Sequence, residues 1–457
     1  MVTLRRICER LALVLAVLPA AIALLAPVEA YGKGIRFIRD AEIENIIRAY
    51  STPLFQAAGL DPRSIRVYLV VDNSLNAFVT AGQRMFLNTG LLMKSDSPLE
   101  VIGVIAHETG HIAGGHSITR SQEIRGAQTK AIAAYVLGLA SALVTGEPGL
   151  ATAVISAGQD VALKGLLSYT RGQEQAADQA AVRYLNATGQ SPRGALDFMR
   201  TLSGQEILLA ANQDPYLRTH PLTLDRIAFM ERAVADSAFG DTPARPEFIV
   251  MQARMQAKLI GFLSRTNDVF RAYPETDRSL PARYARTIAL YRAADLGQAL
   301  PMIDQLIAEH PDDPFFHELR AQMLFENGRL ADALPSYRRA VELLDSAATI
   351  RLSLAHTLVE LNAPALDEEA IGHLEAVLAR EPRNTLAWRL SATAYGRKGD
   401  KGMTALSLAE EALVRGQLKD ARGQAARAQD LMARGSPGWL RAQDVENEAA
   451  RLQSKDK

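Results

Sequence analysis

Apolar positions recur along most of the chain at intervals of three and four residues, the spacing of one face of an α-helix. Between residues 43 and 50 this spacing predicts an amphipathic helix that begins near Asp40. The β-branched run at 65–71 instead predicts a strand, and residues 75–80 and 84–88 flank a short turn and predict a hairpin. The pattern therefore predicts a mainly α protein of the α+β class, with one small β-sheet.

The second half of the chain has a repeated pattern. Ala299-Leu-Pro301 and Ala333-Leu-Pro335 lie 34 residues apart, which is the period of the tetratricopeptide repeat. Ala370-Ile371 begins a third unit, and the segment 388–405 has the residues of a fourth. Since a single helix pair cannot bury its apolar face alone, we expect an α-solenoid over residues 270–436 and a final helix or tail at 437–457. An irregular helical domain is the alternative.

A metal-binding pattern lies at residues 101–116. His107 and His111 are four residues apart, so on a helix they lie one turn apart on the same face and can bind one ion. Glu108 is placed to reach a water on that ion, and two imidazoles with a carboxylate suit Zn²⁺. Ser97-Pro-Leu-Glu100 predicts the start of this helix, with a serine N-cap, a proline in the first turn and a capping-box glutamate.

A third ligand is required, and two candidates stand out. His116 is five residues after His111, whereas the pattern with three histidines has a spacing of about six; only a bend at the two preceding glycines would bring it back. Glu174 and Asp178 are the better pair, four residues apart. One carboxylate can bind zinc while the other accepts the free ring N–H of a ligand histidine.

Several motifs together resemble one peptidase family. Asn76-Ala77-Phe78, the His-Glu-x-Gly-His helix and Arg171-x-x-Glu-x-x-Ala-Asp178 occur in the order found in the HtpX/Oma-type gluzincin zinc metallopeptidases. The resemblance covers most of residues 35–235, and the repeats point to the soluble periplasmic branch of that family. It implies a zincin-type domain at 31–265 with one Zn²⁺ per chain. His107, His111 and Glu174 would be its ligands, Glu108 the general base, and Asp178 the acceptor for a ligand histidine.

Two further segments concern the substrate. A strand near such a site can pair with an extended peptide, so residues 76–78 are candidates for a substrate strand; a purely structural strand is the alternative. His220 lies in Arg218-Thr-His-Pro221, which resembles a late family motif. His220 can donate to the oxyanion, or enter the open position and hold the enzyme inactive, or serve only a loop.

The N-terminus predicts export. Arg5, Arg6 and Arg10 precede the apolar segment 11–25, and Val-Glu-Ala30 is a small-residue cleavage site. We therefore expect a signal peptide at residues 1–30 and a periplasmic mature protein; a retained membrane anchor is the alternative. Cys8 is the only cysteine, so the mature chain has no thiol, which suits an oxidising compartment.

Residues 131–163 form two apolar arms around Thr145-Gly-Glu-Pro-Gly149, each too short to span a bilayer. They predict a buried hairpin over the site, or a lid, or a loop that makes peripheral membrane contact. The formal net charge is zero, and this balance gives no indication of nucleic-acid binding.

Taken together, these features predict a periplasmic zinc endopeptidase whose repeats bind protein clients. By the resemblance, the clients are outer-membrane proteins or their assembly machinery. The alternative is a tetratricopeptide chaperone or adaptor with a latent or structural zinc site.

Overall fold

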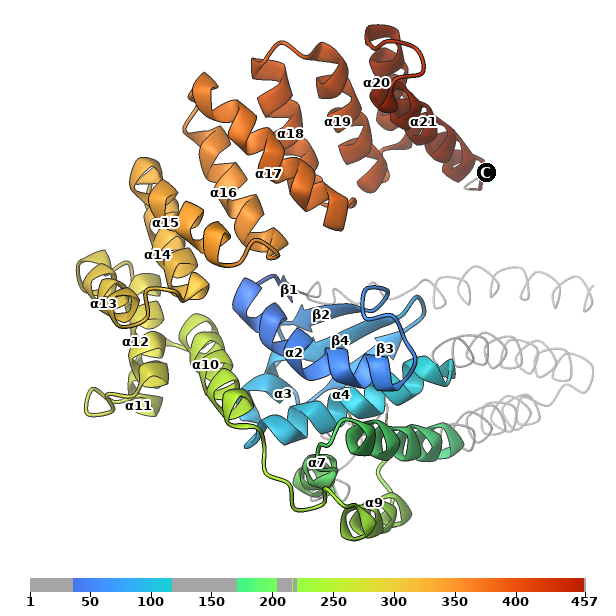
Figure 1. Cartoon of the computed structure of the whole chain (residues 1–457), viewed down its shortest axis with the longest axis vertical. Coiled ribbons are helices and arrows are strands. Elements are labelled where there is room, and N and C mark those ends of the chain that lie inside the picture. The colour runs from blue at the N-terminus through green and yellow to red at the C-terminus, as the bar shows by residue number, and fades with distance from the viewer. Residues whose placement is uncertain (1–35, 117–170, 204–215, 217–219, 456–457) are drawn as a thin grey trace, which may run out of the picture.

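The computed structural model describes residues 36–116, 171–203, 216 and 220–455. The predicted signal peptide and the 131–163 segment lie outside these residues. Within the described chain, no helix is both long enough and apolar enough to cross a bilayer. The predicted fold class is confirmed: a mainly helical chain with one small sheet, followed by stacked helix pairs (Figure 1).

The first domain is built on a sheet in the order β1-β2-β4-β3, from strands β1 (Phe37–Ile38), β2 (Arg66–Val70), β3 (Ala77–Thr80) and β4 (Arg84–Asn88). The predicted hairpin is present as the antiparallel pair β3–β4. β2 runs parallel to β4, and β1 pairs antiparallel to β2; neither pairing was predicted. β3 is consequently an edge strand of the described sheet.

Helices pack on one face of this sheet and form the core (Figure 1). The predicted first helix is α2 (Ala41–Ala57), and the side chain of Asp40 caps it by accepting from Ile43 N. It is followed by α3 (Thr89–Lys94) and α4 (Pro98–Ala113), then by the helical residues 171–187, and then by α7 (Arg193–Ser203), α9 (Leu224–Asp236) and α10 (Pro246–Leu263).

Helix α4 is almost wholly buried, because it lies between α2, β3 and α7. Ser97 is its N-cap and accepts from Leu99 N at 3.2 Å. Glu100 folds back over the same end and accepts from Asp96 N at 3.3 Å, one residue before the predicted capping-box partner. This cap fixes where the helix begins, and therefore which of its side chains face the site.

The repeat helices form a curved stack around one side of the first domain (Figure 1). They are α11 (Thr266–Ala272), α12 (Leu280–Arg292), α13 (Leu296–Glu309), α14 (Pro314–Glu326), α15 (Leu330–Leu343), α16 (Ala348–Glu360), α17 (Asp367–Arg380), α18 (Thr385–Arg397), α19 (Lys401–Val414), α20 (Leu418–Leu431) and α21 (Pro437–Lys455). Ala299 and Ala333, the repeated small residues, are both fully buried, as packing positions of such repeats require.

Buried ion pairs attach the repeats to the first domain. Glu42 of α2 is 1% exposed; it accepts from the Tyr284 hydroxyl at 2.9 Å and pairs with Arg254 at 2.7 Å. Lys258 of α10 pairs with Asp40 at 2.7 Å and reaches Glu318 of α14 at 4.0 Å. Arg254, also on α10, pairs with Asp313 at the start of α14. Removing one member of a buried, paired cluster leaves an uncompensated charge, so this cluster fixes how the repeats meet α2.

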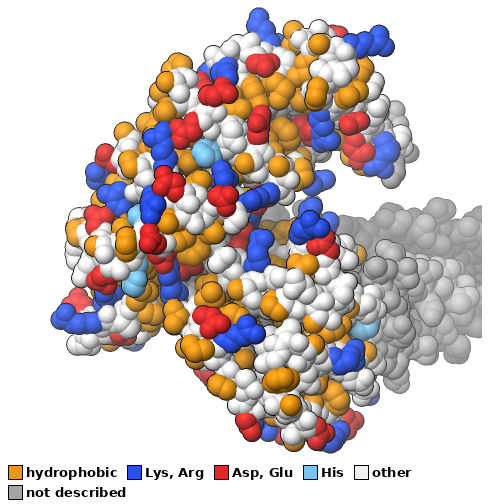
Figure 2. All heavy atoms as spheres, in the orientation of Figure 1, with side chains coloured by type: hydrophobic (Ala, Val, Ile, Leu, Met, Phe, Trp, Pro, Cys, Tyr) orange, Lys and Arg blue, Asp and Glu red, His pale blue; other side chains and the backbone are white. Residues whose placement is uncertain are grey.

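A groove of ≈ 580 Å³ lies between the first domain and the repeats, and Figure 2 shows the hollow between the two parts. One wall comes from β1, the start of α2 and α10, and the other from α14, α15, α16 and the α17–α18 turn. The lining mixes apolar side chains such as Phe262, Phe325 and Leu352 with charges of both signs. The concave side of the repeats therefore faces the first domain across an open groove.

Candidate metal centre

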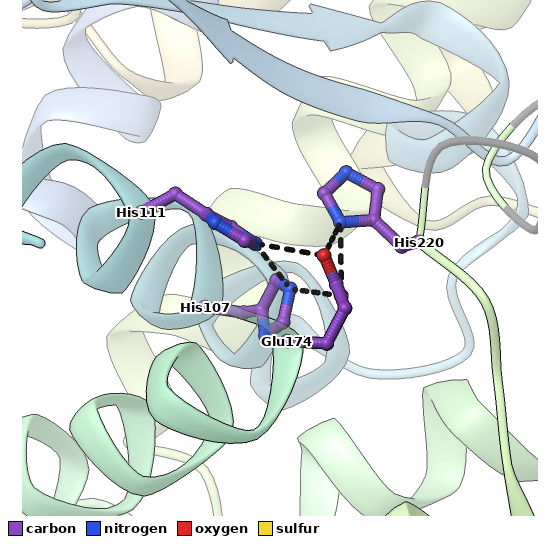
Figure 3. A group of neighbouring side chains, drawn as sticks. All are labelled: His107, His111, Glu174 and His220. Atoms are coloured by element: carbon purple, nitrogen blue, oxygen red, sulfur yellow. Dashed lines mark hydrogen bonds and ion pairs between the residues drawn. The ribbon is translucent and has the colours of Figure 1, made fainter. Parts of the chain in front are cut away.

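Three ring-bearing side chains and one carboxylate converge on a single point (Figure 3). His107, His111, Glu174 and His220 are all buried, and one potential ligand atom from each lies within 4.8 Å of the others. His107 and His111 come from α4, Glu174 from the helical residues 171–187, and His220 from the segment before α9. Residues far apart in the sequence thus meet at this site.

The distances between the four side chains are short enough for them to share one ion. His107 Nε2 lies 3.1 Å from His111 Nε2 and 3.2 Å from Glu174 Oε2. His111 Nε2 lies 3.3 Å from Glu174 Oε1. His220 Nδ1 is 3.1 Å from both oxygens of Glu174. Four donors of these types match the nitrogen and carboxylate ligands that zinc takes.

Gly110 allows the two helices to come this close. A Cβ at position 110 would lie 2.9 Å from the backbone oxygen of Ala177, so any larger residue would push residues 171–187 away from α4. Gly110 lies inside the His-Glu-x-Gly-His pattern, one residue before His111. The small residue is therefore needed for Glu174 to reach the two histidines.

Asp178 and Arg226 hold the outer side of the site. Asp178 Oδ1 lies 2.9 Å from His107 Nδ1, and Nε2 of that ring faces the cluster. Arg226 of α9 is buried and donates to both oxygens of Asp178, at 2.7 and 2.9 Å. It also pairs with Glu174 at 3.0 Å and donates to the backbone oxygen of Pro221 at 2.9 Å. One guanidinium thus joins both acidic residues to the loop that carries His220.

Electrostatics distinguish the two histidines of α4. Burial works against protonation of His107, but its bonds to Asp178 and Glu174 outweigh burial and raise the pKa of His107 to about 10. Burial lowers the pKa of His111 to about 3. Burial also opposes ionisation of Glu174, yet His220 and the ring groups of His107 and His111 hold the pKa of Glu174 well below its ordinary value. The ionised carboxylate of Glu174 beside the His107 and His111 rings therefore offers a place that a divalent cation can take by displacing a proton.

Glu108 follows His107 on α4 and is fully buried, with Oε1 3.5 Å from His220 Nε2. His220 lies between Glu108 and Glu174, and its ring stacks on Tyr216 with centroids 4.5 Å apart at 25°. Tyr216 also accepts from His220 N at 2.7 Å through its backbone oxygen. Sequence reasoning missed Tyr216, although its position four residues before His220 was a usable signal.

The remaining predicted residues lie nearby or outside the cluster. Asn76 and Ala77 are buried beside α4, and Phe78 points to the other face of the sheet, where it stacks on Phe86 at 4.8 Å. His116 does not join the four-residue group. Its ring instead contacts the outer side of His111.

A His-Glu-x-x-His helix with a carboxylate that converges from a second helix is an arrangement typical of zinc metallopeptidases. Residues 38–234 match the model of "Peptidase family M48", and residues 284–348 match a tetratricopeptide repeat model. The chain therefore contains an M48 metallopeptidase domain followed by tetratricopeptide repeats, which confirms the family resemblance of the motifs. The protein is a metalloprotease.

Relatives align with this chain over most of their length. The beta-barrel assembly-enhancing protease of Yersinia pestis is 25% identical over 368 residues, which cover 78% of this chain and 73% of the relative. A putative protease of the same name from Vibrio cholerae is 26% identical, with 77% and 71% covered. The Escherichia coli protein of that name is 22% identical, with 84% and 78% covered.

Proposed function

We propose that the protein is a zinc-dependent endopeptidase that is exported to the periplasm and cuts outer-membrane proteins whose assembly stalls. The convergence of His107, His111 and Glu174 is the observation that carries the hydrolase part of this proposal. The printed names of the relatives, which refer to β-barrel assembly, support the choice of client. The export segment before residue 31 supports the compartment.

We propose His107, His111 and Glu174 as the ligands of one zinc ion per chain. Asp178 holds His107 Nδ1, so the Nε2 atom of that ring faces the position where the three donors meet. Zinc suits two imidazole nitrogens and one carboxylate, and when bound it supplies Lewis acidity toward a water and a peptide carbonyl. Burial opposes ionisation of Asp178, but Arg226 and His107 hold the pKa of Asp178 below its ordinary value, and Arg226 also pairs with Glu174 at 3.0 Å.

Glu108 is proposed as the general base. Its carboxylate is buried next to the cluster, within 3.5 Å of His220 Nε2, so it reaches the space between the ligands and the substrate side. There it can take a proton from the attacking water and later give that proton to the leaving amine. No other described carboxylate of the cluster is available for this role, because Glu174 is a proposed ligand and Asp178 is held by Arg226.

His220 is proposed to fill the fourth position in the resting enzyme. A catalytic zinc site has three protein ligands and an open position, whereas a site with four protein ligands is closed. His220 supplies a fourth donor atom within 4.8 Å of the other three, and its ring is 3% exposed. Hydrolysis then requires His220 to withdraw. We therefore propose that His220 inhibits the resting enzyme and does not donate to the oxyanion.

The β3 edge is proposed to hold the substrate backbone. β3 lies against α4, and the other side of β3 pairs with no strand in the described part of the sheet. An extended peptide that pairs with β3 would have its scissile bond near His107 and His111.

The groove between the domains is proposed to receive the client or a partner from the assembly machinery. The limits proposed for the parts are 1–30 for the signal peptide, 31–265 for the peptidase domain, 270–436 for the repeats and 437–457 for the C-terminal segment. Mass spectrometry of the mature protein tests the first limit: we expect a start near Tyr31, and an intact N-terminal segment would favour a membrane-anchored peptidase.

The decisive variant for peptidase function is Glu108→Gln, which keeps the shape of the site but removes the base. We expect zinc binding to be unchanged and cleavage of an unfolded outer-membrane protein to fall by about a hundredfold or more. A control is Glu360→Gln, which changes an exposed carboxylate at the end of α16. If Glu108→Gln restores normal outer-membrane assembly in cells while changes in the groove do not, the adaptor alternative is correct and the peptidase proposal fails.

A further inference from the structure

The outer side of His111 has a partner of its own. His111 directs Nε2 toward the cluster, 3.1 Å from His107 Nε2, and its Nδ1 points away from it. That Nδ1 lies 2.9 Å from Nδ1 of His116, and the two rings meet edge to face with centroids 5.0 Å apart at 75°. The contact has hydrogen-bond length, so one ring donates and the other accepts.

The end of α4 is built to place His116 there. The helix stops at Ala113, and Gly115 takes φ +66, a left-handed conformation that reverses the chain. A Cβ at Gly114 would lie 2.5 Å from Nε2 of His116. The paired glycines therefore return the chain over His111 and leave space for the imidazole, whereas a continuing helix would turn His116 away.

The tautomers follow from the role of His111. A ring that offers the Nε2 lone pair to a cation must carry its proton on Nδ1, and a buried N–H of this kind needs an acceptor. His107 has Asp178 in that position at 2.9 Å. His111 has only His116 at the corresponding distance among the described residues. His116 accepts through Nδ1 when its own proton is on Nε2.

We infer that His116 is a positioning residue for the metal centre: it accepts the Nδ1–H of His111 and so fixes the orientation and tautomer of that ligand. This inference rests on the proposed metal centre and adds a residue to it. His116 acts on the ion only through His111, since it lies outside the four-residue group. Outer partners of ligand histidines commonly affect metal affinity by about 10- to 100-fold.

Three variants of the full-length protein separate the hydrogen bond from the shape of the ring. His116→Asn keeps an acceptor atom at the position of Nδ1, and His116→Leu puts a methyl group there. Gly114→Ala leaves His116 in the chain but displaces its ring, and φ −75 at position 114 is suitable for alanine. Zn²⁺ affinity is measured by competition with a chromogenic chelator, and ligand geometry by the visible absorption of the Co²⁺-loaded protein.

We expect His116→Leu and Gly114→Ala to bind Zn²⁺ at least about tenfold more weakly than the native protein, with an altered Co²⁺ spectrum, and His116→Asn to stay within about threefold. Thermal unfolding of the metal-free proteins should be the same for all four. The inference is overturned if His116→Leu binds Zn²⁺ as tightly as the native protein, or if His116→Asn is as weak as His116→Leu. Native protein that binds no metal overturns the metal centre itself.

Discussion

Replacing His220 by alanine distinguishes two opposite roles of this residue. His220 Nδ1 contacts both oxygens of Glu174 at 3.1 Å, and its ring stacks on Tyr216 at 4.5 Å. If His220 fills the fourth position, it must leave before a substrate enters, and His220→Ala removes that step. If it stabilises the oxyanion instead, the same variant removes a catalytic donor.

The contacts set the size of the expected effect. A hydrogen bond to a charged group contributes about 1.5–3 kcal/mol, and an aromatic contact about 0.5–1.5 kcal/mol. Withdrawal therefore costs roughly 2–4 kcal/mol, which corresponds to an open fraction on the order of one in 30 to one in 1000. Activity is reduced by that fraction, so His220→Ala should raise kcat/KM by as much as roughly 30- to 1000-fold. Loss of an oxyanion donor would instead lower kcat by about 100- to 1000-fold.

The assay is cleavage of a fluorogenic unfolded outer-membrane protein by zinc-loaded enzyme, with initial rates over a range of substrate concentrations. His310→Ala serves as a matched control, because His310 is an exposed histidine at the end of α13. The double variant Glu108→Gln/His220→Ala should be inactive, which shows that any gain comes from this site. A fall in kcat for His220→Ala would refute the inhibitory role.

Two further predictions concern the supports of the site. Arg226→Met leaves the buried carboxylates of Asp178 and Glu174 without their guanidinium, so the peptidase domain should lose about 3–5 kcal/mol of stability; calorimetry that shows a change below about 1 kcal/mol would contradict this. Burial raises the pKa of Glu100 to about 7, so its contribution to stability is present below its ordinary pKa of 4.5 and is lost as the pH rises through 7. Glu100→Gln should therefore increase the free energy of unfolding by about 1 kcal/mol at pH 8.5, which raises the melting temperature, and have little effect near pH 4. An equal effect at both pH values would show that Glu100 does not titrate this way.

Local features of the sequence predict the elements of the site well. Ser97, Pro98 and Glu100 define the start of α4, and the four-residue spacing of His107 and His111 defines its metal-facing side. The period of 34 residues predicts the repeats, because packing between neighbouring helix pairs requires small residues such as Ala299 and Ala333 at fixed positions. In each case the residues that carry the sequence pattern lie in, or next to, the helices that the pattern predicts.

Long-range pairing is what the sequence leaves open. Glu174 and Asp178 are both carboxylates, four residues apart, so the sequence alone does not show how their environments differ. That difference depends on Arg226, which lies 48 residues after Asp178 and donates to both oxygens of the Asp178 carboxylate. The parallel pairing of β2 with β4 depends likewise on a crossing connection rather than on either strand. The spacing of His116 leaves it a candidate ligand, because the contact of its ring with His111 cannot be predicted from that spacing.

The most direct measurement is the zinc content of the native protein and of Glu174→Gln after dialysis against a weak chelator. If His107, His111 and Glu174 bind one ion together, the native chain should retain one zinc ion and the variant should retain almost none. A native chain without stoichiometric zinc, or a Glu174→Gln variant that retains zinc as the native chain does, would contradict the metal centre on which the proposed peptidase activity depends.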